Sequence, residues 1–373
     1  MKASTLLEQL ENMGIQTITG VPDSTLKQFC DGVQVYHGNL KHYVTANEGA
    51  AVALAIGSYL ATEKPACVYM QNSGIGNAVN PLASLANRDV YGIPMLFIVG
   101  WRGEPGVKDE PQHVFQGKIT CELFDTLAVP YRVIDQNTSD GEMDEILLEA
   151  EKILRQGDQF ALIVKKGTFE KEETFKWENG NSMLREEALS HILKGVSHDT
   201  VIVSTTGKIS RELYEQSEKL YGNHDNLFMT VGGMGHASMI ALGIAKNRQD
   251  KKVLCIDGDG AALMHMGALP FIAAQAPENF YHIVINNQAH ESVGAMPTGC
   301  RGTVFAQVAE AAGYREVSRL EAMTEVDKIG QWIAEKTGPV FWEIPVTLDA
   351  RADLGRPKES ARENKESFME FMK

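Results

Sequence analysis

The feature that most restricts how this chain can fold is the segment of residues 253–291. Two apolar runs enclose a helical pattern, and each run ends in a short polar turn. In order, these parts are the run 253–256, Asp257-Gly258-Asp259-Gly260, the helical pattern 261–274, the run 280–285 and Asn286-Asn287. Two strands joined by a helix form a right-handed βαβ unit, whose parallel strands end at the same edge of a sheet. The sequence therefore predicts that Asp259 and Asn287 lie at one sheet edge.

The two polar turns have the composition of a site for magnesium and a diphosphate. The carboxylate of Asp259 and the amide oxygen of Asn287 are a poor cage for Ca²⁺ but suit Mg²⁺, which takes its remaining ligands from water and phosphate. Gly258 and Gly260 allow close approach of the backbone, and a helix that begins near Ala261 directs N–H groups at a negative ligand. The segment therefore predicts a Mg-diphosphate site.

Length, charge and cysteine usage narrow the class of protein. A chain of 373 residues predicts two domains of ordinary size. The net charge of −14 argues against general binding to nucleic acids or to anionic membrane surfaces. The N-terminal segment resembles no signal peptide, and no apolar run has the length of a transmembrane helix, so we expect a cytoplasmic protein. The cysteines, at positions 30, 67, 121, 255 and 300, form no CxxC pair and predict reduced thiols.

Alternating apolar runs and helical patterns predict the α/β fold class, with two doubly wound parallel sheets. One series covers residues 1–167. Residues 168–184 are dense in charge and end in Asn, Gly and Ser, which indicates a solvated linker. The second series covers residues 185–373, including a polar C-terminal tail. Among the expected helices are those at 23–31, 261–274, 323–336 and a short one at 368–372.

The turn Gly258-Asp259-Gly260, followed after the next strand by Asn286-Asn287, resembles the signature of thiamine-diphosphate-dependent enzymes. The order of the two domains is similar to that of the decarboxylase branch of this family, with a pyrimidine-binding domain before a diphosphate-binding domain. The resemblance implies the thiamine-diphosphate-binding fold in both halves and thiamine diphosphate and Mg²⁺ as cofactors. It also implies specific contacts: Asp259, Asn287 and the backbone carbonyl of Ala289 would bind the metal, and Gly258, Gly260 and Ala261 would contact the cofactor.

Glu48 is the expected activating acid. It follows Asn47 at the start of an apolar helix, where a carboxylate is costly to bury without a partner. An acid in the first turn of a helix also complements the helix dipole, so the position alone leaves a purely structural role open. By the family resemblance, Glu48 exchanges a proton with the aminopyrimidine ring of the cofactor. A raised pKa in an apolar pocket suits that exchange.

The loop Gly232-Gly233-Met234-Gly235 follows an expected strand. Its spacing does not match the dinucleotide fingerprint GxGxxG, which weakens a nicotinamide dehydrogenase as an alternative. The resemblance implies that Met234 is a wedge between the two rings of the cofactor and that the Gly232 carbonyl accepts a hydrogen bond from the aminopyrimidine. The alternative is a tight turn with Met234 in the core.

Three loops, at 19–24, 71–77 and 100–113, each follow an expected strand, where ligands lie in such sheets. The loop at 100–113 is too long and too rich in Gly, Pro and charge for a simple connector. Together with residues 286–294, these loops resemble family members that decarboxylate 3-phosphonopyruvate to phosphonoacetaldehyde and CO₂, a step of phosphonate biosynthesis. The alternatives are a sulfopyruvate decarboxylase and a catalytically silent cofactor-binding protein.

The loops contain the candidate proton carriers and substrate ligands, although single residues of these types are often only solvated. The candidate proton carriers are Asp23, His113, His290 and Glu291. A phosphonate requires charge-assisted or polar donors, for which the candidates are Ser24, Asn72, Ser73, Arg102, Lys108 and Lys208. We expect a small anionic 2-oxo acid as substrate and neither nucleic acid nor membrane as a partner. In this family the activating acid and the metal site at one cofactor come from different subunits, which implies a homodimer or a larger homo-oligomer.

Overall fold

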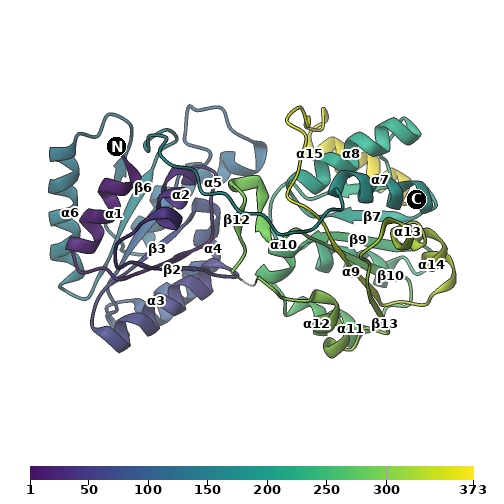
Figure 1. Cartoon of the computed structure of the whole chain (residues 1–373), viewed down its shortest axis with the longest axis horizontal. Coiled ribbons are helices and arrows are strands. Elements are labelled where there is room, and N and C mark those ends of the chain that lie inside the picture. Colours follow the sequence, from purple (N-terminus) through teal and green to yellow (C-terminus); the bar gives the residue numbers. More distant parts are fainter. Residues whose placement is uncertain (300) are drawn as a thin grey trace. The chain divides into compact units, whose positions relative to one another are not determined.

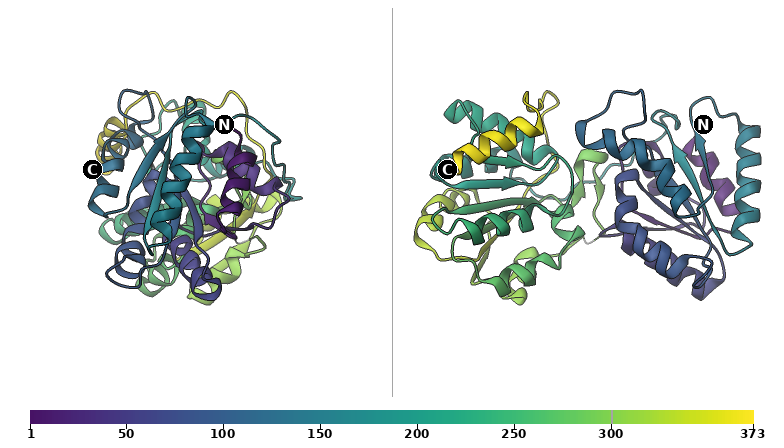
Figure 2. Two further views of the ribbon diagram at one scale, coloured as in Figure 1. Left: turned by 90° about the vertical axis from the view of Figure 1, so that its left-hand side faces the viewer. Right: turned by 180° about the vertical axis from the view of Figure 1, so that it is seen from behind.

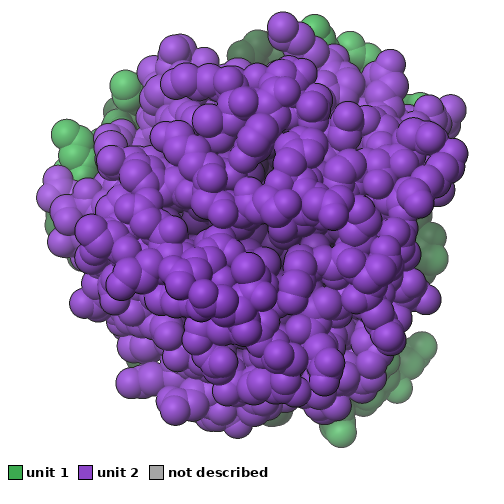
Figure 3. All heavy atoms as spheres, turned by 90° about the vertical axis from the view of Figure 1, so that its right-hand side faces the viewer, with its two compact units in different colours: residues 1–177, 290–299 green, residues 178–289, 300–373 purple. Residues whose placement is uncertain are grey.

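The structure, a computed structural model, describes residues 1–299 and 301–373, and these form two compact units (Figure 1). Unit 1 consists of residues 1–177 and 290–299, and unit 2 consists of residues 178–289 together with the described residues from 301 onward. Figure 3 colours the two units separately.

Unit 1 contains a six-stranded parallel sheet with the strand order β2-β1-β3-β4-β6-β5. The strands are β1 (Thr17–Gly20), β2 (Lys41–Val44), β3 (Ala66–Gln71), β4 (Met95–Gly100), β5 (Tyr131–Ile134) and β6 (Gln159–Val164). Apolar side chains of α1 (Ala3–Asn12), α2 (Lys27–Val35) and α6 (Asp140–Leu154) form a core on one face of the sheet. Helices α3 (Glu48–Thr62), α4 (Ile75–Pro81) and α5 (Pro111–Thr126) cover the other face (Figure 2), and their apolar side chains form a second core there.

Unit 2 contains a second six-stranded parallel sheet, with the order β13-β14-β10-β9-β7-β8. The strands are β7 (Val201–Ser204), β8 (Leu227–Met229), β9 (Val253–Gly258), β10 (Phe280–Asn286), β13 (Glu316–Arg319) and β14 (Val340–Pro345). The helices are α7 (Arg185–Gly195), α8 (Lys208–Tyr221), α9 (Ala237–Asn247), α10 (Asp259–Met264), α11 (Ala268–Gln275), α12 (Phe305–Ala312), α13 (Met323–Val326), α14 (Ile329–Glu335) and α15 (Ala361–Phe371). Helices α7, α8, α13 and α14 share one core with the sheet. The two doubly wound α/β sheets expected from the sequence are confirmed.

Each sheet has a point at which the chain reverses its direction of winding. In unit 1 this point lies between β1 and β3, and in unit 2 it lies between β7 and β9. Ligands of open α/β sheets bind beyond the carboxyl ends of the strands at such points. The loops that follow β1, β3, β7 and β9 are therefore the first place to look for a functional site.

Several expected elements differ from those observed. The helix expected at 23–31 starts only at Lys27, because the Asp23 side chain accepts the N–H groups of Thr25 and Leu26 and closes a turn. The helix expected at 261–274 is two helices, α10 and α11, interrupted at residues 265–267. The helix expected at 323–336 is likewise divided into α13 and α14.

The C-terminal helix and one internal segment were also not foreseen in full. The tail helix expected at 368–372 is longer, because Ser360 and Glu363 form a capping box that starts α15 at Ala361. Residues 290–299 pack with unit 1, where Met296 joins the core and the Tyr69 hydroxyl lies 3.9 Å from its sulfur. A two-stranded sheet is formed by β11 (Ala289–His290), at the start of this segment, and β12 (Met296–Pro297).

Two expectations based on composition concern cysteines and membranes. Within the described ranges no helix combines the length and the apolar character needed to traverse a bilayer. Cys30, Cys67, Cys121 and Cys255 are free thiols. Cys300 lies outside the described residues.

Candidate active site

Asp259 and Asn287 follow the carboxyl ends of two neighbouring strands. Strands β9 and β10 pair in parallel with Gly258 opposite Ile285, so α10 begins at Asp259 just beside the end of β10. Backbone N–H groups of Gly260, Gln288 and Asn287 donate to the Asp259 carboxylate. The structure therefore brings the two residues together.

The Asp259 carboxylate has the features of a cation ligand. Its Oδ2 atom is buried and has no hydrogen-bond partner among the described residues. Burial raises the pKa of this carboxyl to about 7, against the opposing effect of the backbone N–H groups. An ionised carboxylate in such a place is costly unless a cation compensates it. Asn287 Oδ1 accepts the Ala289 N–H at 3.1 Å, which fixes the orientation of the amide. These groups fit a Mg²⁺ ion with oxygen ligands.

The loop that contains Asn287 is held by buried polar contacts. Asn286 Nδ2 donates to the fully buried Glu343 at 2.7 Å, and Asn286 Oδ1 accepts the Gln288 N–H at 3.1 Å. Asn179 Nδ2 donates to the Asn287 carbonyl at 2.8 Å. Because these contacts restrain the loop on both sides of Asn287, the fold itself determines the position of this residue.

The opposite side of this site is formed by the end of β7 and the start of α8. Strand β7 pairs with β9, and the Thr205 N–H donates to the Ile256 carbonyl at 2.9 Å. A Cβ atom on Gly258 would lie 3.4 Å from the Ile209 side chain, so the two loops are in close contact. Lys208 is the first residue of α8. It therefore lies at the edge of unit 2 near Asp259.

The glycine-rich loop after β8 lies against the break between α10 and α11. Gly235 has φ +87°, and a Cβ atom there would lie 2.7 Å from the His265 ring and 2.9 Å from the Ala261 carbonyl. The rings of His236 and His265 stack with centroids 4.3 Å apart. Met234 is half-buried and not a core residue, which leaves its side chain accessible to a ligand. The sequence contained no signal for His265, because its surroundings favour an uninterrupted helix.

In unit 1, Glu48 lies at the start of α3 and is buried, with 5% of its surface exposed. Asn77 Nδ2 donates to Glu48 Oε2 at 2.8 Å. A Cβ atom on Gly74 would lie 2.4 Å from Glu48 Oε1, so glycine is required for the carboxyl to occupy this place. Burial raises the pKa of the Glu48 carboxyl, and the hydrogen bond from Asn77 opposes that rise. The direction of the shift is that expected of an acid that exchanges protons near neutral pH.

Asp23 is fully buried at the point of reversal between β1 and β3. Gln71 Nε2 donates to Asp23 Oδ1 at 2.6 Å, and Ser73 Oγ donates to Gln71 Oε1 at 2.7 Å. A Cβ atom on Gly100 would lie 2.1 Å from Asp23 Oδ2. Burial raises the pKa of Asp23, although Gln71 and the charge of Arg102 oppose the rise. Gln71 was not among the expected site residues.

Arg102 lies beside this group and is held by several contacts. Its Nε and Nη2 atoms donate to Asp109 at 2.8 and 2.5 Å, and its Nη1 donates to Ser24 Oγ at 2.9 Å. The side chain of Asn72 is fully buried and bonds to the backbone N–H and carbonyl of Arg102. Its amide nitrogen also contacts Thr120 Oγ1 at 2.8 Å. The side chain of Asn72 therefore helps to position the loop that begins at Arg102.

The remaining candidates differ in their surroundings. His113 lies in the first turn of α5, and burial and the charge of Arg102 lower its pKa to about 4. Burial also lowers the pKa of His290 to about 4. Both imidazoles are therefore neutral near pH 7 unless a ligand changes their surroundings. Glu291 is half-buried, whereas Lys108 is exposed on the loop before α5.

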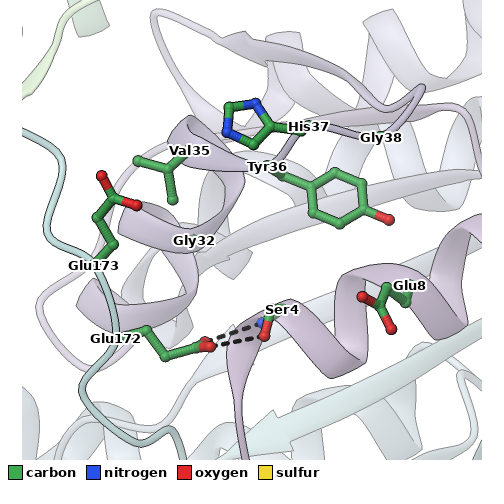
Figure 4. A pocket seen from close by; sticks show the side chains of 9 residues that line it. All are labelled: Ser4, Glu8, Gly32, Val35, Tyr36, His37, Gly38, Glu172 and Glu173. Carbon is green, nitrogen blue, oxygen red and sulfur yellow. Dashed lines mark hydrogen bonds between the residues drawn. The ribbon is translucent and has the colours of Figure 1, made fainter.

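Unit 1 also has a cavity of about 450 Å³ on its outer surface, at α1, α2 and residues 172–173 (Figure 4). Three carboxylates line it, from Glu8, Glu172 and Glu173. Glu172 accepts hydrogen bonds from the backbone and hydroxyl of Ser4, at 3.0 and 2.7 Å. These carboxylates repel an anionic substrate, and none of the expected site residues lines the cavity. It is therefore not part of the candidate active site.

Comparison with known proteins identifies both halves of the chain. Residues 2–126 match the N-terminal TPP binding domain of thiamine pyrophosphate enzymes, and residues 211–344 match the C-terminal TPP binding domain. The chain is 32% identical to a phosphonopyruvate decarboxylase of Streptomyces hygroscopicus, over 100% of this chain and 94% of that protein. It is 32% identical to one of Streptomyces viridochromogenes, over 99% of this chain and 94% of that protein. A sulfopyruvate decarboxylase of Methanosarcina acetivorans is 26% identical over 79% of this chain and 77% of that protein.

Proposed function

Because the chain belongs to the thiamine pyrophosphate enzyme family, we propose that it is a Mg²⁺-dependent decarboxylase that converts 3-phosphonopyruvate to phosphonoacetaldehyde and CO₂. The observation that carries this proposal is the similarity to two phosphonopyruvate decarboxylases along the whole chain. The buried Asp259 oxygen without a partner among the described residues and the buried acid Glu48 are consistent with it. The product would enter phosphonate biosynthesis.

The carboxyl edge of unit 2 would hold the metal and the diphosphate. Asp259, Asn287 and the Ala289 carbonyl would be the protein ligands of Mg²⁺. The N–H groups at the start of α10, with Gly258, would face the diphosphate. The loop of Gly232 and Met234 would contact the rings of the cofactor.

Bound thiamine diphosphate supplies the electron sink that accepts the electron pair released when CO₂ leaves. Glu48 would hold a proton on its carboxyl and exchange it with the aminopyrimidine nitrogen. Its burial favours the neutral form, and the bond from Asn77 keeps the carboxyl in one orientation. The raised pKa of Glu48 favours a carboxyl that can both donate and accept this proton.

The polar residues around Asp23 and Arg102 in unit 1 would bind the substrate. Arg102 and Ser24 offer N–H and O–H donors for the phosphonate oxygens. Asp23, whose raised pKa favours a protonated carboxyl, would deliver a proton to the carbon that has lost CO₂. His113 would take up a proton from solvent when the negatively charged phosphonate binds nearby, because that charge raises the pKa of the imidazole.

We also propose that the active form is a homodimer or a larger homo-oligomer. The exposed stripe of α3 consists of small and apolar residues, which are Ala50, Ala53, Leu54, Gly57 and Leu60. Leu60 is 70% exposed and Leu54 is 38% exposed, whereas Ala51, Val52 and Ala55 on the other side of the helix are buried. A continuous apolar stripe of this kind is typical of a helix that packs against another chain. Glu48 begins the same helix, which would put the activating acid beside the subunit interface.

The second candidate function is decarboxylation of sulfopyruvate, which has the weaker and partial similarity. The test is CO₂ release by the purified protein from phosphonopyruvate, sulfopyruvate and pyruvate, with Mg²⁺ and thiamine diphosphate present. We expect the highest kcat/KM for phosphonopyruvate. A higher value for sulfopyruvate would establish the second candidate. Cofactor binding without turnover of any of the three would indicate a catalytically silent protein.

A further inference from the structure

The backbone of the loop between β4 and α5 packs directly against the first turns of α5. A Cβ atom on Gly103 would lie 1.8 Å from the His113 carbonyl, and one on Gly117 would lie 1.8 Å from the Gly103 carbonyl. Trp101 Nε1 donates to the Gly117 carbonyl at 2.9 Å. The backbone of this loop therefore has little room to move relative to the first turns of α5. A side chain anchored in the loop can be held in one place.

Asp109 is the anchored side chain, and each of its oxygens accepts two donors. Oδ2 accepts Arg102 Nε and the Gly103 N–H, both at 2.8 Å. Oδ1 accepts Arg102 Nη2 at 2.5 Å and the Glu110 N–H at 2.8 Å. The hydrogen bond from Arg102 is the largest cause that lowers the pKa of Asp109 to about 2, so the group is ionised at neutral pH. Asp109 thus fixes both the position and the plane of the Arg102 guanidinium.

From this geometry we propose that Asp109 is a positioning residue that selects for a phosphonate by holding the free N–H groups of Arg102 towards the substrate. The inference rests on the proposed function and names the feature of the substrate that the site recognises. Three of the five guanidinium N–H groups are used, two by Asp109 and one by Ser24. Among the described residues, one N–H remains on each terminal nitrogen. Two such groups match two oxygens of one phosphonate.

Ser24 extends the same recognition to a third oxygen. Its Oγ accepts from Arg102 Nη1, so its own O–H is directed elsewhere and is available to a ligand. Arg102 is only 21% exposed, so its donors are partly removed from water. A tetrahedral oxyanion satisfies them, whereas the methyl group of pyruvate leaves them unpaired. Sites of this kind reject an analogue that lacks the hydrogen-bonding group.

Because Asp109 balances the charge of Arg102, selection depends on geometry as well as on charge. Besides the exposed Lys108 and the neighbouring Glu110, the titratable groups whose charges act on the pair are Asp23 and His113, and burial shifts the pKa of each towards its neutral form. The site therefore has little excess positive charge with which to hold an anion of arbitrary shape. A variant that keeps the positive charge but loses the alignment should lose selectivity.

The test compares Asp109→Asn with Asp250→Asn. Asp250 forms the same side-on pair with Arg248, at 2.8 and 2.7 Å, on an exposed turn before β9, at the opposite end of that strand from Asp259. We expect Asp109→Asn to raise the KM for phosphonopyruvate about 10-fold or more, the loss of about 1.4 kcal/mol or more of binding. Its kcat and its KM for pyruvate should stay near wild type. Asp250→Asn should change neither, and Asp109→Glu should restore part of the affinity.

Equal changes for both substrates, or a lower melting temperature without a change in selectivity, would show that Asp109 only supports the loop. If Asp109→Asn does not fold, Arg102→Lys is the second variant, since it keeps the charge and loses the paired N–H groups. It should raise the KM for phosphonopyruvate alone, and an equal effect on pyruvate would overturn the inference.

Calorimetry with phosphonoacetate, an analogue that does not react, separates the inference from the proposed function. Binding to wild type with thiamine diphosphate and Mg²⁺, and its loss in Asp109→Asn, supports the inference even if phosphonopyruvate is not turned over. Equal binding by both proteins overturns it.

Discussion

Replacing Glu48 by Gln removes a proton while keeping the shape of the side chain. The amide side chain would fill the same space against Gly74, and its carbonyl oxygen would still accept the hydrogen bond from Asn77. General acid–base catalysis contributes about 10²–10⁴-fold to a rate, so we expect kcat to fall by about that factor. In free energy this corresponds to about 3–5 kcal/mol of the barrier. The affinity for thiamine diphosphate should change little, because the residues proposed to bind the metal and the diphosphate belong to unit 2.

The same variant has an effect on stability that does not depend on activity. Because burial raises the pKa of Glu48, the folded protein binds more protons than the unfolded chain between the ordinary glutamate pKa and the raised one. Wild-type stability therefore falls as pH rises through that window, and the loss persists above it. The Glu48→Gln variant lacks this dependence on pH. Its melting temperature relative to wild type should rise from pH 4 to pH 8.

The assays are CO₂ release under saturating substrate and thermal unfolding across that pH range. Glu142→Gln is the matched control, because Glu142 lies in the first turn of α6 and is exposed. It should leave kcat and the pH dependence unchanged. Turnover of Glu48→Gln within a few-fold of wild type, with no stability difference at pH 8, would refute the assignment of Glu48 as a buried proton carrier.

Three further perturbations have defined outcomes. Asp259→Asn should weaken Mg²⁺ binding in the presence of thiamine diphosphate by about 100-fold, measured by equilibrium dialysis. Losing a residue that only hydrogen-bonds to a metal ligand costs about 10–100-fold in metal affinity, and losing a charged ligand costs more. Unchanged affinity would remove Asp259 from the metal site. Glu212→Ala breaks the ion pair of Glu212 and Arg185, whose side chains are 1% and 3% exposed, respectively. The variant should lose about 3–5 kcal/mol in the free energy of unfolding, measured with urea, because an unpaired charge is left buried. A loss below about 1 kcal/mol, which is typical of an exposed pair, would contradict this reasoning. Leu54→Glu with Leu60→Glu should convert an oligomer to monomers in sedimentation velocity; an unchanged mass would locate the interface elsewhere.

The sequence indicated those parts of the site that depend on the order of strands, turns and helices within one segment of the chain. The run of strand, turn, helix and strand made Asp259 and Asn287 neighbours, because parallel strands end at one edge. The burial of Glu48 was also inferable, because it opens a helix of apolar residues. In both cases the pattern lies within one continuous segment of the chain.

The parts that the sequence did not indicate depend on contacts between distant segments. The interruption of α10–α11 at His265 follows from the close approach of Gly235 and the stacked ring of His236. The sequence places Asn72 in a loop after a strand, but it does not indicate that the Asn72 amide bonds to the backbone of Arg102, 30 residues away. Asp109 was interpreted only as part of a charged loop. Its role depends on four hydrogen bonds that no residue pattern specifies.

The most direct measurement is calorimetric titration of thiamine diphosphate into the purified chain, with Mg²⁺ and then with a chelator. The proposed site requires saturable binding of one cofactor per chain in the presence of the metal, and its loss when the metal is removed. No uptake with Mg²⁺ present, or equal uptake in the chelator, would contradict the metal site formed by Asp259 and Asn287.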